Sequence, residues 1–99
     1  MTTIDTSITH ITSSDGNIFK DLGFSSEEAG KLKIKAQLMC QISELIKEKH
    51  LKQEEASHLL HVTRPRVSDI MRGKAGKFSI DALVDMLERM GKRVTVQVN

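Results

Sequence analysis

Five basic side chains within one short stretch are the residues whose chemistry stands out in this sequence. Between residues 61 and 77 they are Arg64, Arg66, Arg72, Lys74 and Lys77. Asp69 is the one acidic residue of the stretch, which leaves it a net charge of +4. A solvated helix face can have this composition, and so can a nucleic-acid-binding surface that attracts phosphate groups. The charge pattern alone leaves both interpretations open.

Residue types that support catalysis or metal binding do not form a recognisable set. His58 and His61 lie three residues apart, but a zinc site needs further ligands and His61 falls beyond the end of a predicted helix. The single Cys40 excludes an internal disulfide and a metal site built from cysteines alone. No nucleophile–base pair or phosphate-binding glycine loop is visible. We therefore expect a protein without enzymatic activity, metal or cofactor.

Length and composition indicate one small binding domain. A chain of 99 residues can build one modest core. Three phenylalanines, with no Trp or Tyr, offer little for stacking the bases of single strands. No apolar run approaches the ~20 residues that a membrane span needs, and one cysteine is compatible with a reducing compartment. A cytoplasmic protein without membrane segments is expected.

A long first helix is predicted between residues 25 and 50. Ser25 and Glu28 form a capping-box pattern at its start. Apolar side chains recur along it at helical spacing, namely Ile34, Leu38, Met39, Ile42, Leu45 and Ile46. We expect this face, together with Cys40, to fill the core.

Two short helices, at 53–60 and 64–72, are predicted next, joined by a tight turn. Thr63 is a suitable N-cap for the second of them, and Gly73 ends it. The second helix of such a pair fits the major groove of B-DNA, about 12 Å wide, with its first-turn side chains at base edges. Its outward-facing residues are Thr63, Arg64, Arg66, Ser68, Asp69 and Arg72.

The C-terminal part is predicted to add one helix and one strand. Ser79 and Gly91 bound the helix, and residues 93–98 then alternate apolar and polar side chains, which predicts a β-strand. A single strand needs a partner for its backbone groups. We expect a second copy of the chain to supply it in a homodimer; the N-terminal segment or another protein's sheet edge is the alternative.

Charge divides the chain into two parts. Residues 1–30 contain one lysine and five acidic residues, a net charge of −4, whereas the remaining residues carry 14 basic and 8 acidic side chains, or +6. We expect residues 1–24 to form a partly disordered N-terminal arm. Residues 25–99 would then form a mainly α, small helical bundle that contains the helix-turn-helix and ends in the β-strand.

Five motifs give the chain a resemblance to a known family. They are NIFKDLG at 17–23, KQEEA at 52–56, RPRVSDIMRG at 64–73, FSIDAL at 78–83 and GKRV at 91–94. With these motifs, residues 17–98 resemble the Xre/Cro (phage-repressor) helix-turn-helix superfamily, and within it the HigA-like antitoxins. Two positions depart from the family pattern. His61 replaces the usual turn glycine, so that a left-handed backbone there is slightly strained, and Lys52 replaces the usual Thr.

The resemblance implies a set of residues that bind double-stranded DNA. They are Lys52, Gln53, Thr63, Arg64, Arg66, Ser68, Asp69, Arg72 and Lys74. Gln53 inherits a phosphate contact from the family. Arg64 and Arg66 lie where base contacts are expected, and either can bind guanine or contact phosphate only. Asp69 can accept a hydrogen bond from cytosine, orient Arg66 or form a salt bridge.

The remaining positions are expected mainly to contact the phosphate groups of the DNA backbone. Thr63 can act as a helix cap and touch a phosphate, and Ser68 can reach a phosphate or a base. Arg72, Lys74 and Lys77 are expected to make phosphate contacts that are independent of sequence.

These features support three functional hypotheses. The first is a dimeric repressor that reads an inverted-repeat operator and, by the resemblance, is the antitoxin of a type II toxin–antitoxin pair that neutralises a RelE-like ribonuclease toxin. The second is a stand-alone phage or metabolic repressor without a toxin. The third is an interaction protein whose basic helix is merely solvated, and this hypothesis excludes salt-dependent DNA binding.

Overall fold

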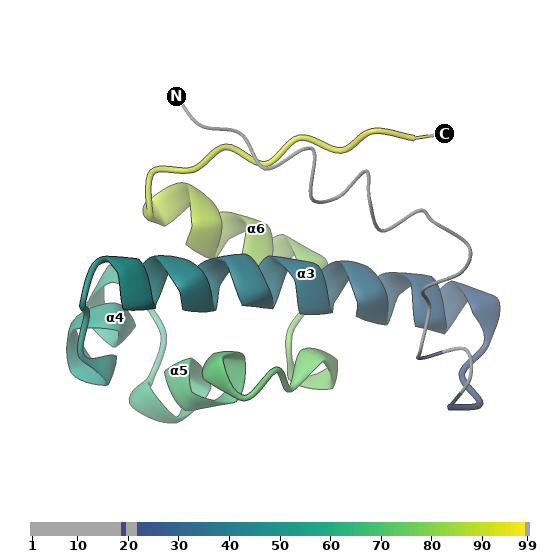
Figure 1. Ribbon diagram of the computed structural model, residues 1–99, viewed down its shortest axis with the longest axis horizontal. Coiled ribbons are helices and arrows are strands. Elements are labelled where there is room, and N and C mark those ends of the chain that lie inside the picture. The colour runs from purple at the N-terminus through teal and green to yellow at the C-terminus, as the bar shows by residue number, and fades with distance from the viewer. Residues whose placement is uncertain (1–18, 20–21, 99) are drawn as a thin grey trace.

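The computed structural model describes Phe19 and residues 22–98. In this part of the chain the elements are α3 (Ser26–Glu48), α4 (Gln53–Leu60), α5 (Arg64–Met71), the 3₁₀ turn η2 (Ala75–Lys77) and α6 (Ile80–Arg89). α3 runs along the molecule, with α6 on one side of it and α5 and η2 on the other (Figure 1). α4 packs against α5 and α6. The predicted small helical bundle is confirmed.

Local side-chain chemistry explains where three of these helices begin. Ser25 accepts a hydrogen bond from the Glu28 backbone N–H at 3.1 Å, and Ser79 accepts one from the Ala82 N–H, also at 3.1 Å. α4 lacks such a cap, because Lys52 has no acceptor in its side chain. Instead Glu55 reaches back and accepts from the Lys52 N–H at 2.8 Å.

One core lies between α3 and the shorter helices. Its buried side chains come from α3, α4, α5, α6 and the segment around η2: Leu38, Met39, Ile42, Leu45, Ile46, Ala56, Leu60, Val67, Ile70, Ala75, Phe78, Leu83, Met86, Leu87 and Met90. The predicted core face of α3 is confirmed except at Cys40, which is exposed. The Cys40 thiol lies 3.7 Å from Glu44 Oε1. Partial desolvation, with the Glu44 carboxylate nearby, raises the pKa of Cys40, which keeps the thiol protonated.

The helices α3, α4, α5 and α6 all end in the same hydrogen-bonding arrangement, with one residue in the left-handed conformation. That residue is His50 after α3 (φ 54°), His61 after α4 (φ 58°), Gly73 after α5 (φ 71°) and Gly91 after α6 (φ 84°). The next amide bonds back to the helix in each case, as in Lys74 N–H to Asp69 O and Lys92 N–H to Leu87 O, both 3.0 Å. These are Schellman motifs. Two of the four therefore place histidine where glycine is less strained.

The C-terminal tail, residues 92–98, does not form the predicted strand. Within the described residues Arg93 is a single bridge position and residues 94–98 are irregular. Val94 packs against the core, but Val96 and Val98 are 69% and 88% exposed. A strand requires a neighbouring backbone along its length, and the described part of the chain offers none to these residues. Within the described residues, the β-strand predicted at 93–98 is therefore not seen beyond the bridge position at Arg93.

Most of the predicted N-terminal arm, residues 1–18, 20 and 21, lies outside the described residues. Over the part that is described, no helix combines the length and apolar character that crossing a membrane requires.

Candidate nucleic-acid interface

The turn between α4 and α5 has the geometry that a helix-turn-helix needs. The Val62 N–H bonds to Ser57 O at 3.0 Å and the His61 N–H to His58 O at 3.4 Å. His61 adopts the left-handed conformation, with φ 58° and ψ 41°. This conformation ends α4 and turns the chain toward α5. Ala56 and Ser57 are small and buried, so α4 and α5 pack closely. The left-handed backbone expected at His61 is confirmed.

α5 presents one face to the core and the opposite face to solvent. Val67 and Ile70 are buried, and the side chains opposite them point away from the bundle. Arg64 and Arg72 are exposed, and neither side chain has a hydrogen-bond or ion-pair partner among the described residues. Thr63 occupies the N-cap position, but its hydroxyl makes no capping hydrogen bond. Within the part of the chain that the structure describes, α5 therefore begins with a hydroxyl that makes no capping bond and an arginine side chain without a partner.

The side of α5 nearer to η2 is different, because its charged residues are engaged with the loop of residues 73–78, here called the following loop. Arg66 donates from Nη1 to Lys77 O at 2.9 Å, and its guanidinium carbon lies 5.2 Å from the centre of the Phe78 ring. The Asp69 carboxylate lies 3.5 Å from Lys77 Nζ and 4.0 Å from Lys74 Nζ. Of the roles considered for Asp69, the free chain therefore adopts the salt bridge. Arg66 is oriented by Phe78 and the loop backbone.

The other predicted site residues lie at the start of α4 and along α5. Lys52 and Gln53 are exposed at the N-terminal end of α4, where unpaired helix N–H groups favour an anion such as phosphate. Ser68 is half-buried on α5. The predicted residues are thus gathered on α4, α5 and the following loop.

Two residues that support this arrangement were missed by the sequence reasoning. Arg89 of α6 donates to Leu60 O, at the C-terminal end of α4, at 3.2 Å. Ser43 of α3 donates to Ile70 O, near the end of α5, at 3.5 Å. The bond from Arg89 satisfies a terminal carbonyl that a helix end leaves unpaired, whereas Ile70 O also accepts from the Gly73 backbone N–H at 3.0 Å. A basic residue in the last turn of α6 gave only a weak signal, because its partner is 29 residues away in sequence.

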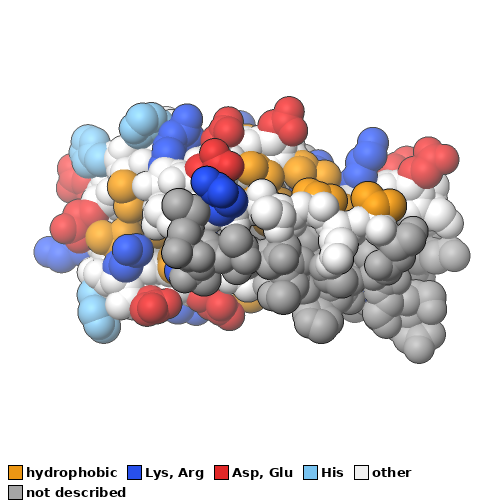
Figure 2. All heavy atoms as spheres, turned by 90° about the horizontal axis from the view of Figure 1, so that it is seen from above, with side chains coloured by type: hydrophobic (Ala, Val, Ile, Leu, Met, Phe, Trp, Pro, Cys, Tyr) orange, Lys and Arg blue, Asp and Glu red, His pale blue; other side chains and the backbone are white. Residues whose placement is uncertain are grey.

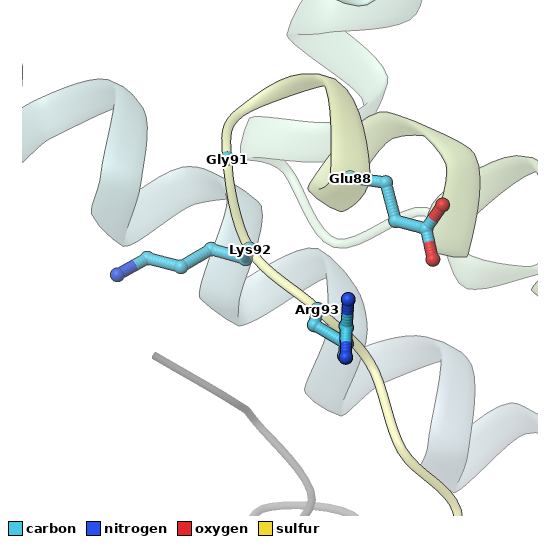
Figure 3. A pocket seen from close by; sticks show the side chains of 4 residues that line it. All are labelled: Glu88, Gly91, Lys92 and Arg93. Atoms are coloured by element: carbon cyan, nitrogen blue, oxygen red, sulfur yellow. The ribbon is translucent and has the colours of Figure 1, made fainter. Parts of the chain in front are cut away.

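Other surfaces of the described chain are less suited to a ligand. A hollow lined by Glu88, Gly91, Lys92 and Arg93 lies where α6 meets the tail. Its side chains do not converge, because Lys92 points away from Glu88 (Figure 3). On the face seen from the α6 side, the visible acidic and basic side chains are interspersed (Figure 2). The visible part of that face lacks the excess of basic side chains found on α5 and the following loop.

Two packed helices joined by a tight turn, the second with exposed arginines, define a helix-turn-helix DNA-binding domain. Residues 18–99 match a family described as a helix-turn-helix domain, and the chain belongs to that family. Membership indicates DNA binding by a type of domain that is typically non-enzymatic. A search of the curated proteins found no match for the chain.

Proposed function

We propose that this protein is a sequence-specific repressor that binds double-stranded DNA through α5. The observation that carries the proposal is the Arg64 side chain, which is exposed, has no partner among the described residues and lies in the first turn of a helix packed in helix-turn-helix geometry. An arginine in this position can bind guanine O6 and N7 with two hydrogen bonds. Lys52, Gln53, Arg72 and the lysines of the following loop then bind phosphates and fix the register.

The repressor binds as a homodimer. A single helix-turn-helix contacts few base pairs, and two related copies read two half-sites about 10 bp apart. Exposed Val96 and Val98 in the tail support this state, because apolar side chains at alternate positions can form one face of a strand that pairs with a second copy. The tails would become the predicted strands on pairing, and the resulting two-fold symmetric dimer would read an inverted-repeat operator.

We further propose that the protein is an antitoxin that neutralises a RelE-like ribonuclease toxin and represses their shared operon. The resemblance of the motifs at 52–56 and 64–73 to HigA-like proteins supports this role. So does the charge of −4 over residues 1–30, which complements the basic surface of an RNA-cleaving enzyme. The stand-alone repressor is the alternative, and it predicts the same DNA binding without a toxin partner.

Selection of binding sites from a randomised duplex library tests the DNA-binding proposal. We expect an inverted repeat to be enriched, with binding that weakens steeply as salt rises. The double variant Arg64→Ala, Arg66→Ala should lose preference for the enriched site but remain folded. Enrichment of no sequence by the wild type would contradict the proposal.

The antitoxin proposal has a separate test. The product of any small reading frame beside this gene is expressed with and without the chain, and growth and complex formation are measured. We expect the full chain to restore growth and a chain lacking residues 1–24 to bind the toxin more weakly. Unchanged toxin affinity after the deletion would contradict the role of the arm, whereas absence of any toxic neighbour would favour the stand-alone repressor.

A further inference from the structure

The following loop is fixed to the first turn of α5 by Arg66. The Arg66 guanidinium donates to Lys77 O at 2.9 Å and lies over the ring of Phe78 at 5.2 Å. Phe78 is itself buried in the core, with 6% of its surface exposed. A planar guanidinium can stack on a ring and donate to a carbonyl in one fixed geometry, which an ammonium group cannot do. Arg66 thus connects α5 to the loop that precedes α6.

Asp69 fixes the same loop one helical turn further along α5. Its carboxylate faces Lys77 Nζ at 3.5 Å and Lys74 Nζ at 4.0 Å, and only 16% of the Asp69 side chain is exposed. The Lys74 backbone N–H also bonds to Asp69 O at 3.0 Å. Both lysines are themselves half-exposed, at 45% and 53% of their side-chain surface. Their ammonium groups therefore keep donors available for a second anion.

The balance of charge at this site favours a phosphate group. Thr63, Pro65, Arg66, Asp69 and Lys77 line a shallow hollow beside α5. A carboxylate on the DNA-facing side of a helix opposes binding unless cations offset it, and the two lysines exceed it by one positive charge. A phosphate oxygen that approaches the loop meets lysines already held in position. An arginine engaged with the loop is poorly placed to reach a base edge at the same time.

We propose that Arg66 and Asp69 are positioning residues that hold Lys74 and Lys77 as a phosphate-binding arm of the interface. Base reading then belongs to the unengaged Arg64. This inference rests on the proposed DNA-binding function, and it assigns Arg64 and Arg66, which the sequence presents as equivalent, to different tasks.

The decisive measurement is the dependence of operator affinity on salt in Arg66→Lys, which keeps the charge but removes the planar group. The slope of log K against log salt is negative, and each lost phosphate contact reduces its magnitude by about 0.9. The double variant Lys74→Gln, Lys77→Gln should reduce the magnitude by about 2. We expect Arg66→Lys to reduce it by about 1 to 2 although its net charge is unchanged. In the double-variant background the same change should have almost no effect, because Arg66 acts through those lysines.

Arg64→Lys is the matched control on the other side of α5. It should change the preferred base at one operator position and leave the slope nearly unchanged, whereas Arg66→Lys should leave base preference unchanged. Two results would overturn the inference: an altered base preference in Arg66→Lys, or additive effects in the combined variants. Failure of the wild type to bind duplex DNA would instead overturn the proposed function.

A measurement without DNA tests the positioning role directly. Amide hydrogen exchange at residues 77 and 78 should accelerate in Arg66→Lys and remain as in the wild type in Arg64→Lys. Equal exchange in all three proteins would show that Arg66 does not hold the loop, whatever the DNA measurements give.

Discussion

The turn that precedes α5 and the loop that follows it carry similar chemistry in different states. In the preceding turn, residues 61–63, the Thr63 hydroxyl makes no capping bond. Arg64, the first residue of α5, has no side-chain partner among the described residues. In the following loop, Lys77 and its neighbours are joined to α5 by Arg66 and Asp69. The start of α5 thus has donors without partners among the described residues, whereas the donors of the following loop are already held by side chains of α5.

This difference bears on how a small domain can bind DNA both tightly and selectively. An unengaged arginine loses side-chain entropy when it binds a base, so it binds well only where two good hydrogen bonds compensate that loss. Lysines that are already held by a carboxylate lose less side-chain entropy on binding. Their ammonium groups are point charges, however, and bind any phosphate. Selectivity is therefore expected from the start of α5, and general affinity from the loop after it.

The largest expected effect is on binding, at Arg64. Replacing Arg64 with Ala should weaken operator binding by about 1–3 kcal/mol, because a guanine contact with two hydrogen bonds is lost. Fluorescence anisotropy with the selected duplex measures the change. Lys31→Ala is the control, since Lys31 is an exposed basic residue of α3, outside the proposed interface, and its loss should alter binding far less. Equal losses in the two variants would mean that Arg64 contributes only charge.

The next effect concerns the end of α5, where Gly73 adopts φ +71°. Gly73→Ala should lower the free energy of unfolding by about 1 kcal/mol, because an L-residue is strained in this conformation. No atom lies within 4 Å of the added Cβ, so the cost comes from the backbone alone. Urea denaturation measures it. Gly76→Ala also meets open space, at a backbone without positive φ, and should change stability much less.

In the preceding turn, a substitution at the left-handed residue should raise the free energy of unfolding rather than lower it. His61 has φ 58°, so His61→Gly relieves strain at the end of α4. The gain is partly offset by the greater freedom of glycine in the unfolded chain. We expect the free energy of unfolding to rise by about 0.5 kcal/mol. His50→Gly, at the same position after α3, should behave alike, and a loss of stability in both variants would show that these histidines make compensating contacts.

Local sequence signals predicted the helices well because caps and apolar spacing act within a few residues. Ser25, Ser79, Gly73 and Gly91 start or end helices where the sequence indicated. The exposure of Cys40 and the irregular tail were not predicted, because both depend on what packs against them from elsewhere in the fold. The same limit applies to the site. The bond from Arg66 to Lys77 joins residues 11 apart, so nothing in the motif distinguishes Arg66 from Arg64.

The smallest expected change in stability is at Thr63, and it separates capping from DNA binding. Since the Thr63 hydroxyl makes no capping bond, Thr63→Ala should leave the free energy of unfolding within a few tenths of a kcal/mol of the wild type. Ser79→Ala, which removes the bond to the Ala82 N–H, should cost about 1 kcal/mol.

Operator affinity should show the reverse order. Thr63→Ala removes a hydroxyl from the first turn of the helix that faces DNA, whereas Ser79 begins α6, outside the proposed interface. Thr63→Ser keeps the hydroxyl and should restore affinity. If Thr63→Ala instead destabilises the protein as much as Ser79→Ala, the hydroxyl caps α5 in solution. The unengaged state of the preceding turn, and with it the contrast with the following loop, would then be wrong.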